Sequence, residues 1–67
     1  GRLPEAESYM REAWSMLRNA EIAAHLGEVL WALGQKEEAR AVWDEGVELE
    51  SDNEVLIDTM QRFGELP

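Results

Sequence analysis

The sequence predicts an all-α fold of about four antiparallel helices, arranged as helix-turn-helix repeats. The first observation is an internal repeat, because Gly-Gln-Lys-Glu-Glu-Ala-x3-Trp at 34–43 echoes Gly-Arg-Leu-Pro-Glu-Ala-x3-Met at 1–10, 33 residues earlier. The second is that apolar residues recur at steps of three and four along most of the chain. The third is that residues which start or stop helices separate these apolar stripes. Together these observations indicate a helical repeat protein.

The first helix is expected to run from about residue 4 to residue 16. Pro4 suits its opening position, where a missing N–H group costs nothing, and Glu5 lies favourably near the positive end of the helix dipole. Its apolar stripe consists of Ala6, Tyr9, Met10, Ala13, Trp14 and Leu17. Since no earlier helix of the same repeat is present in the sequence, we expect part of this stripe to be exposed.

Asn19 is expected to cap a second helix that ends near Leu33. Its packing side consists of Ile22, Ala23, Leu26, Gly27, Val29, Leu30 and Leu33. A glycine inside a helix costs up to about 1 kcal/mol relative to alanine. Gly27 therefore indicates that another helix comes close at this point.

Gly34 is expected to form the next turn with a positive φ, so that the third helix starts at Gln35 or Lys36. The buried side of this helix consists of Ala39, Val42, Trp43, Gly46, Val47 and Leu49. Gly46, like Gly27, suits a close helix crossing.

A fourth helix is expected over residues 54–63, capped either by Ser51, which has capping-box spacing to Glu54, or by Asn53. Gly64 and then Pro67 are expected to end it. Its narrow apolar stripe consists of Val55, Leu56, Thr59, Met60 and Phe63. A polar outer side is typical of a helix that covers the end of a repeat array.

Residues 20–53 resemble a tetratricopeptide repeat, whose pattern is Trp-x2-Leu-Gly-x2-Tyr, then Ala-x3-Phe-x2-Ala, then Pro. This chain has Ala23-x2-Leu26-Gly27-x2-Leu30, then Ala39-x3-Trp43-x2-Gly46, then Ser51-Asp52-Asn53. Trp43 replaces the aromatic Phe, whereas Ala23, Leu30, Gly46 and Ser51 depart from the family's Trp, Tyr, Ala and Pro. The resemblance implies the second helix of a truncated repeat at 1–19, a complete repeat at 20–53, and a capping helix with its tail at 54–67.

The tetratricopeptide resemblance further implies a non-catalytic scaffold or adaptor that binds a protein or peptide on the concave face of the array. Carried onto this sequence, that face consists of Glu21, Ala24, His25, Glu28, Trp31 and Ala32. Trp31 is its most informative member, because aromatic residues are enriched at binding hot spots. The alternative is that Trp31 packs against the fourth helix or an adjoining repeat.

Glu21 and Glu28 make this expected face acidic. Family members that clamp a terminal carboxylate do so with Lys, Asn and Arg, and no basic residue stands at these positions here. The expected partner is therefore a protein or peptide of basic or mixed apolar character. The alternative is that both glutamates are simply solvated.

The stretches 22–34 and 39–43 are also similar to the C-terminal repeats of Gram-negative outer-membrane tetratricopeptide lipoproteins. Some of those act as adaptors for periplasmic proteases. This narrower resemblance implies a bacterial periplasmic location; without it, the cytoplasm is the expected compartment.

The composition argues against several other classes of function. With 15 acidic and 6 basic residues, the formal net charge is −9, which disfavours nucleic acids and anionic membrane surfaces. There is no cysteine, no signal peptide, and no apolar run of about 18 residues that would span a membrane.

No metal site, cofactor site or catalytic site is expected. Glu21, His25 and Glu28 share one helical side, but no ligand from another element is recognisable. The serines lack a nucleophile-elbow context, and there is no glycine-rich phosphate loop.

The alternative functions are self-association as a homodimer and a purely structural role as the end cap of a longer tetratricopeptide array. Tyr9, Trp14 and Leu17 on the first helix are candidates for pairing with the same surface of a second chain. Trp14 and Trp43 also suit the core, as do the three methionines, Met10, Met16 and Met60.

Overall fold

The computed structural model describes residues 2–65, which form four α-helices and contain no strand. The helices are α1 (Leu3–Met16), α2 (Ala20–Ala32), α3 (Lys36–Leu49) and α4 (Glu54–Arg62). The predicted all-α class and the four predicted helices are therefore confirmed. Gly1 and Pro67, which belong to the expected first repeat and the expected chain end, lie outside the described residues.

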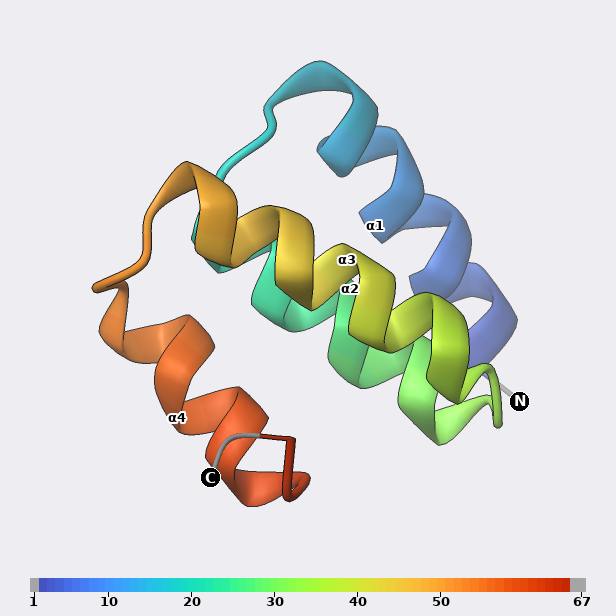
Figure 1. Ribbon diagram of the computed structural model, residues 1–67. Coiled ribbons are helices and arrows are strands. Elements are labelled where there is room, and N and C mark those ends of the chain that lie inside the picture. The colour runs from blue at the N-terminus through green and yellow to red at the C-terminus, as the bar shows by residue number, and fades with distance from the viewer. Residues whose placement is uncertain (1, 66–67) are drawn as a thin grey trace.

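Helix α2 lies at the centre of the fold and contacts each of the other three helices. Helix α3 packs along α2, and α1 and α4 flank this pair on opposite sides (Figure 1). None of the helices between residues 2 and 65 is long and apolar enough to cross a membrane.

Two asparagines and two glycines set the helix ends. The side-chain oxygen of Asn19 accepts a 2.7 Å hydrogen bond from the Ile22 amide, and that of Asn53 accepts a 3.0 Å bond from the Leu56 amide. Asn53, rather than Ser51, therefore caps α4. Gly34 and Gly64 take positive φ angles of 85° and 73°, which permit the turns after α2 and α4.

Replacing Asn19 with alanine is expected to lower the free energy of unfolding by about 1 kcal/mol, because the Ile22 amide loses its capping partner. Asn19→Asp keeps the acceptor and should cost much less. Urea unfolding of the three chains measures both values. A loss in Asn19→Ala no larger than that in Asn19→Asp would show that the cap does not stabilise α2.

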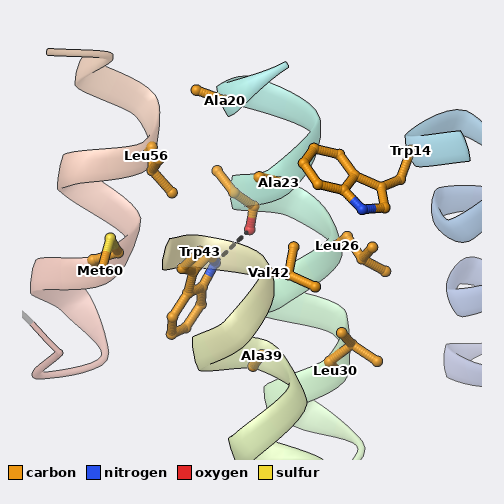
Figure 2. Close-up of a cluster of buried hydrophobic side chains, with 11 residues drawn as sticks. Trp14, Ala20, Ala23, Leu26, Leu30, Ala39, Val42, Trp43, Leu56 and Met60 are labelled. Atoms are coloured by element: carbon orange, nitrogen blue, oxygen red, sulfur yellow. Dashed lines mark hydrogen bonds between the residues drawn. The ribbon is translucent and has the colours of Figure 1, made fainter. Parts of the chain in front are cut away.

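Trp43 is the centre of the core and is fully buried, with 0% of its surface exposed. It extends from α3 between α2 and α4 (Figure 2), and its indole N–H donates a 3.2 Å hydrogen bond to the carbonyl of Ala24. The remaining buried apolar residues are Trp14, Ala20, Ala23, Ala24, Leu26, Leu30, Ala39, Val42, Leu56 and Met60.

Both helical glycines lie at close crossings, as predicted. A Cβ atom on Gly27 would stand 2.0 Å from the indole nitrogen of Trp43. A Cβ atom on Gly46 would stand 2.8 Å from the Cβ of Ala23 and 2.9 Å from a methyl carbon of Leu56. These two glycines therefore let α2, α3 and α4 approach one another.

Three residues expected on buried stripes are exposed instead. Leu49 is the last residue of α3 and is 53% exposed, and Val55 in the first turn of α4 is also exposed. Met16, the last residue of α1, is 79% exposed. All three lie in a terminal turn of their helix, where the neighbouring helices no longer cover the apolar stripe.

Candidate functional site

The first candidate surface is the α2 face, made of the residues that the sequence placed on a concave wall. They are Glu21, Ala24, His25, Glu28, Trp31 and Ala32. Of these, Glu21, His25 and Ala32 are exposed, whereas Glu28 and Trp31 are half-buried. The α2 face therefore displays only part of the expected set.

Ala24 does not belong to an exposed surface, so its predicted role as a displayed residue is wrong. It is fully buried, and its carbonyl accepts the hydrogen bond from Trp43. The physical reason is that α4 packs on this side of α2 and covers it.

Trp31 packs inside the fold rather than standing free on the α2 face. Its ring stacks on Trp43 with centroids 5.7 Å apart, and it meets Phe63 at the end of α4 at 5.4 Å. The Nζ of Lys36 and the guanidinium of Arg40 lie 5.1 Å and 5.5 Å from its ring centroid. The alternative that Trp31 packs against the fourth helix is therefore confirmed.

The acidity of the α2 face is partly neutralised. Arg62 of α4 forms a 2.9 Å ion pair with Glu28 and lies 3.5 Å from Asp58. Glu21 and His25 share this side of the helix. Among residues 2–65, however, no group of three or more His, Asp or Glu side chains is arranged to hold a metal ion.

The second candidate surface is an apolar hollow between α1 and the start of α2, which we call the α1 groove. It has a volume of about 320 Å³ and is lined by Tyr9, Glu12, Ala13, Met16, Leu17 and Ile22. Tyr9, Met16 and Leu17 are 73%, 79% and 60% exposed. Exposed apolar side chains gathered on one side of a small domain make this groove a candidate interaction surface.

Trp14 does not contribute to this surface, so its predicted role in self-association is wrong, whereas its predicted place in the core is confirmed. It is buried and points from α1 toward α2 near Ala23 and Leu26 (Figure 2). The guanidinium of Arg18 lies 4.9 Å from its ring centroid. Tyr9 and Leu17, the other two residues of that prediction, are exposed.

Arg11 of α1 and Arg18, which follows the helix, are directed toward α3 and away from the groove. Arg11 forms 2.7 Å ion pairs with Glu7 and Glu38, and Arg18 forms a 3.0 Å ion pair with Glu45. The hydrogen bond from Arg11 lowers the pKa of the Glu38 carboxyl below its usual value. At neutral pH the Glu38 carboxylate is therefore charged and engaged with Arg11.

A second, smaller hollow lies at the C-terminal end of α3. It is lined by Arg18, Glu45, Glu48 and Leu49. Arg18 and Glu45 form an ion pair with each other in its lining, and Glu48 adds a second carboxylate. It offers less apolar contact than the α1 groove.

Comparisons with protein-family models, with curated proteins and with solved structures gave no match to this chain. The described part of the chain is an all-α domain of four helices that carries the open, apolar α1 groove.

Four residues that line the α1 groove, Glu12, Ala13, Met16 and Ile22, were not among the predicted site residues, although a signal for Met16 was present. Met16 follows Tyr9 by seven residues, which places both on the same side of a helix after two turns. Tyr9 was expected on a partly exposed stripe, so Met16 belonged with it rather than with the core.

Proposed function

We propose that this chain is a non-catalytic protein-interaction module whose α1 groove binds an apolar helical segment of another protein. The observation that carries the proposal is the exposure of Tyr9, Met16 and Leu17 around one hollow. Fully burying each such side chain is worth about 1.5 to 3 kcal/mol. Covering the groove therefore provides a driving force for association.

The shape of the groove favours a helix as the bound element. An amphipathic helix lays apolar residues at helical spacing into a groove between two helices. The α1 residues that line the groove, Tyr9, Ala13, Met16 and Leu17, themselves recur at three- and four-residue steps. The resemblance to tetratricopeptide repeats supports the same role, that of a scaffold or adaptor segment in a helical array.

The α2 face supports recognition less well than the α1 groove. Its one aromatic residue, Trp31, is engaged by Trp43 and Phe63, and its Glu28 is paired with Arg62. What the α2 face presents to a partner is Glu21, His25 and Ala32, a small and mostly polar surface.

Self-association through the α1 groove is the second candidate, because a copy of the chain would also bury Tyr9 and Leu17. The net charge of −9 opposes it, since two like-charged chains repel each other. Sedimentation of the chain over a range of concentrations separates the two candidates. If the chain sediments as a monomer at every concentration, self-association is excluded and the groove is free to bind a different protein.

The variant Leu17→Asp tests whether partners bind in the groove, and Leu49→Asp is the matched control. Both leucines are similarly exposed, at 60% and 53%, so neither change should alter the free energy of unfolding by more than about 0.5 kcal/mol. Helical peptides selected from a display library on the native chain should bind Leu17→Asp at least about tenfold more weakly, a loss of about 1.4 kcal/mol.

The same peptides should bind Leu49→Asp as they bind the native chain. Equal binding to Leu17→Asp and the native chain would place recognition elsewhere and contradict the proposal. A library that yields no binder to the folded native chain would contradict it as well.

A further inference from the structure

We infer that the occupant of the α1 groove is an amphipathic helix with basic residues along one flank. This inference rests on the proposed function and adds the charge of the partner. It is carried by the carboxylates that border the apolar hollow, together with the absence of any basic side chain among the six residues that line it.

The acidic border of the groove runs along α1. Glu12 lines the groove directly, and Glu5 shares its side of the helix because it precedes Tyr9 by four residues. Both glutamates are exposed. They lie seven residues apart, which is two helical turns or about 10 Å along the axis.

Arg11 and Arg18 do not offset this border. Arg11 points to the opposite side of α1, Arg18 follows the end of that helix, and their ion pairs to Glu38 and Glu45 link this part of the chain to α3. Arg2, the N-cap of α1, precedes Tyr9 by seven residues and so lies on the groove side at the start of the helix, where it offsets part of the charge of Glu5 but not that of Glu12, two turns further on.

The spacing of the apolar lining residues and of Glu5 and Glu12 sets where the anchors and the basic residues of the partner helix must lie. Apolar residues at positions i, i+4 and i+7 of a bound helix match the spacing of Tyr9, Ala13 and Met16. Lys or Arg residues seven positions apart on its flank would face Glu5 and Glu12. A second copy of this chain does not fit, because its own α1 would bring the same two glutamates against the acidic border.

Three synthetic peptides of about 15 residues test the inference, each long enough for a short helix. They carry identical Leu anchors at i, i+4 and i+7 and differ only at two flank positions seven residues apart, which hold Lys, Gln or Glu. We expect the Lys peptide to bind about tenfold more tightly than the Glu peptide, and 0.5 M NaCl to reduce this difference. A Lys peptide with Ser in place of Leu should not bind.

Charge removal in the protein provides the matched comparison. The double variant Glu5→Gln, Glu12→Gln should weaken binding of the Lys peptide about three- to tenfold and leave binding of the Gln peptide unchanged. The control is Glu37→Gln, Asp44→Asn, which removes two exposed carboxylates at the same seven-residue spacing on α3. The control variant should bind the Lys peptide as the native chain does.

The alternative results have distinct meanings. Equal affinity of the Lys, Gln and Glu peptides would overturn the basic partner and leave the proposed function standing. Binding of the Ser-substituted peptide would show that charge acts without the groove and would overturn the inference. If none of the peptides bound the folded chain, or if the chain formed a dimer that Leu17→Asp dissolves, both the inference and the proposed partner would be wrong.

Discussion

Trp43→Ala is expected to leave the chain largely unfolded at room temperature. Truncating a fully buried Trp to Ala costs about 3 to 5 kcal/mol, because its packing is lost and a cavity remains. A single hydrophobic core in a chain of this length rarely supplies more than about 3 to 5 kcal/mol, so the loss is comparable to the whole stability. The substitution also leaves the buried carbonyl of Ala24 without its 3.2 Å hydrogen bond.

Trp43→Phe serves as the control, because Phe keeps an aromatic ring at this position and loses only part of the volume. We expect a thermal transition for Trp43→Phe that lies between those of the native chain and Trp43→Ala. Circular dichroism at about 222 nm, where helices absorb, follows the unfolding of all three chains. A Trp43→Ala transition within a few degrees of the native one would show that Trp43 does not hold α2, α3 and α4 together.

Gly27→Ala is expected to destabilise the fold by about 2 to 3 kcal/mol, although alanine is the better helix former. The gain in helix propensity is at most about 1 kcal/mol. Against it, the new Cβ atom would stand 2.0 Å from the indole nitrogen of Trp43, so the ring must move. Overpacking of this kind typically costs about 1 to 3 kcal/mol, and loss of the hydrogen bond to Ala24 adds to it.

Two comparisons make the Gly27 result specific. Ala32→Gly changes the propensity of the same helix at an exposed position and should cost no more than about 1 kcal/mol. Combining Gly27→Ala with Trp43→Phe should cost less than the sum of the two single changes, because the smaller ring leaves room for the methyl group. A Gly27→Ala chain more stable than the native one in urea unfolding would mean that the crossing is not tight.

The helix ends could be predicted from the sequence because their chemistry is local. The side-chain oxygens of Asn19 and Asn53 accept hydrogen bonds from backbone amides three residues later in the chain. Gly34 supplies a positive φ, which other residues rarely adopt. The close crossing at Gly27 was equally readable, because a glycine weakens a helix interior and is favoured there where a neighbouring element must come close. No knowledge of distant residues was needed in either case.

The extent of burial along each helix could not be predicted in the same way, because it depends on residues far away in the chain. Trp31 is half-buried because Trp43 stacks on its ring and Phe63, 32 residues later in the chain, packs against it at a tilt. Ala24 is buried because α4 covers that side of α2. Conversely, the stripe on α1 is wider than the surface that α2 covers, which leaves Met16 exposed.

The α1 groove, rather than the α2 face, is the surface that we propose to bind a partner helix. The most direct measurement is a titration of the ¹⁵N-labelled chain with the Lys-flanked peptide, followed by two-dimensional NMR. We expect the amide signals of Tyr9, Ala13 and Leu17 to shift, while those of His25, Glu28 and Ala32 stay in place. Shifts concentrated at His25, Glu28 and Ala32, or no shifts at all, would contradict binding in the α1 groove.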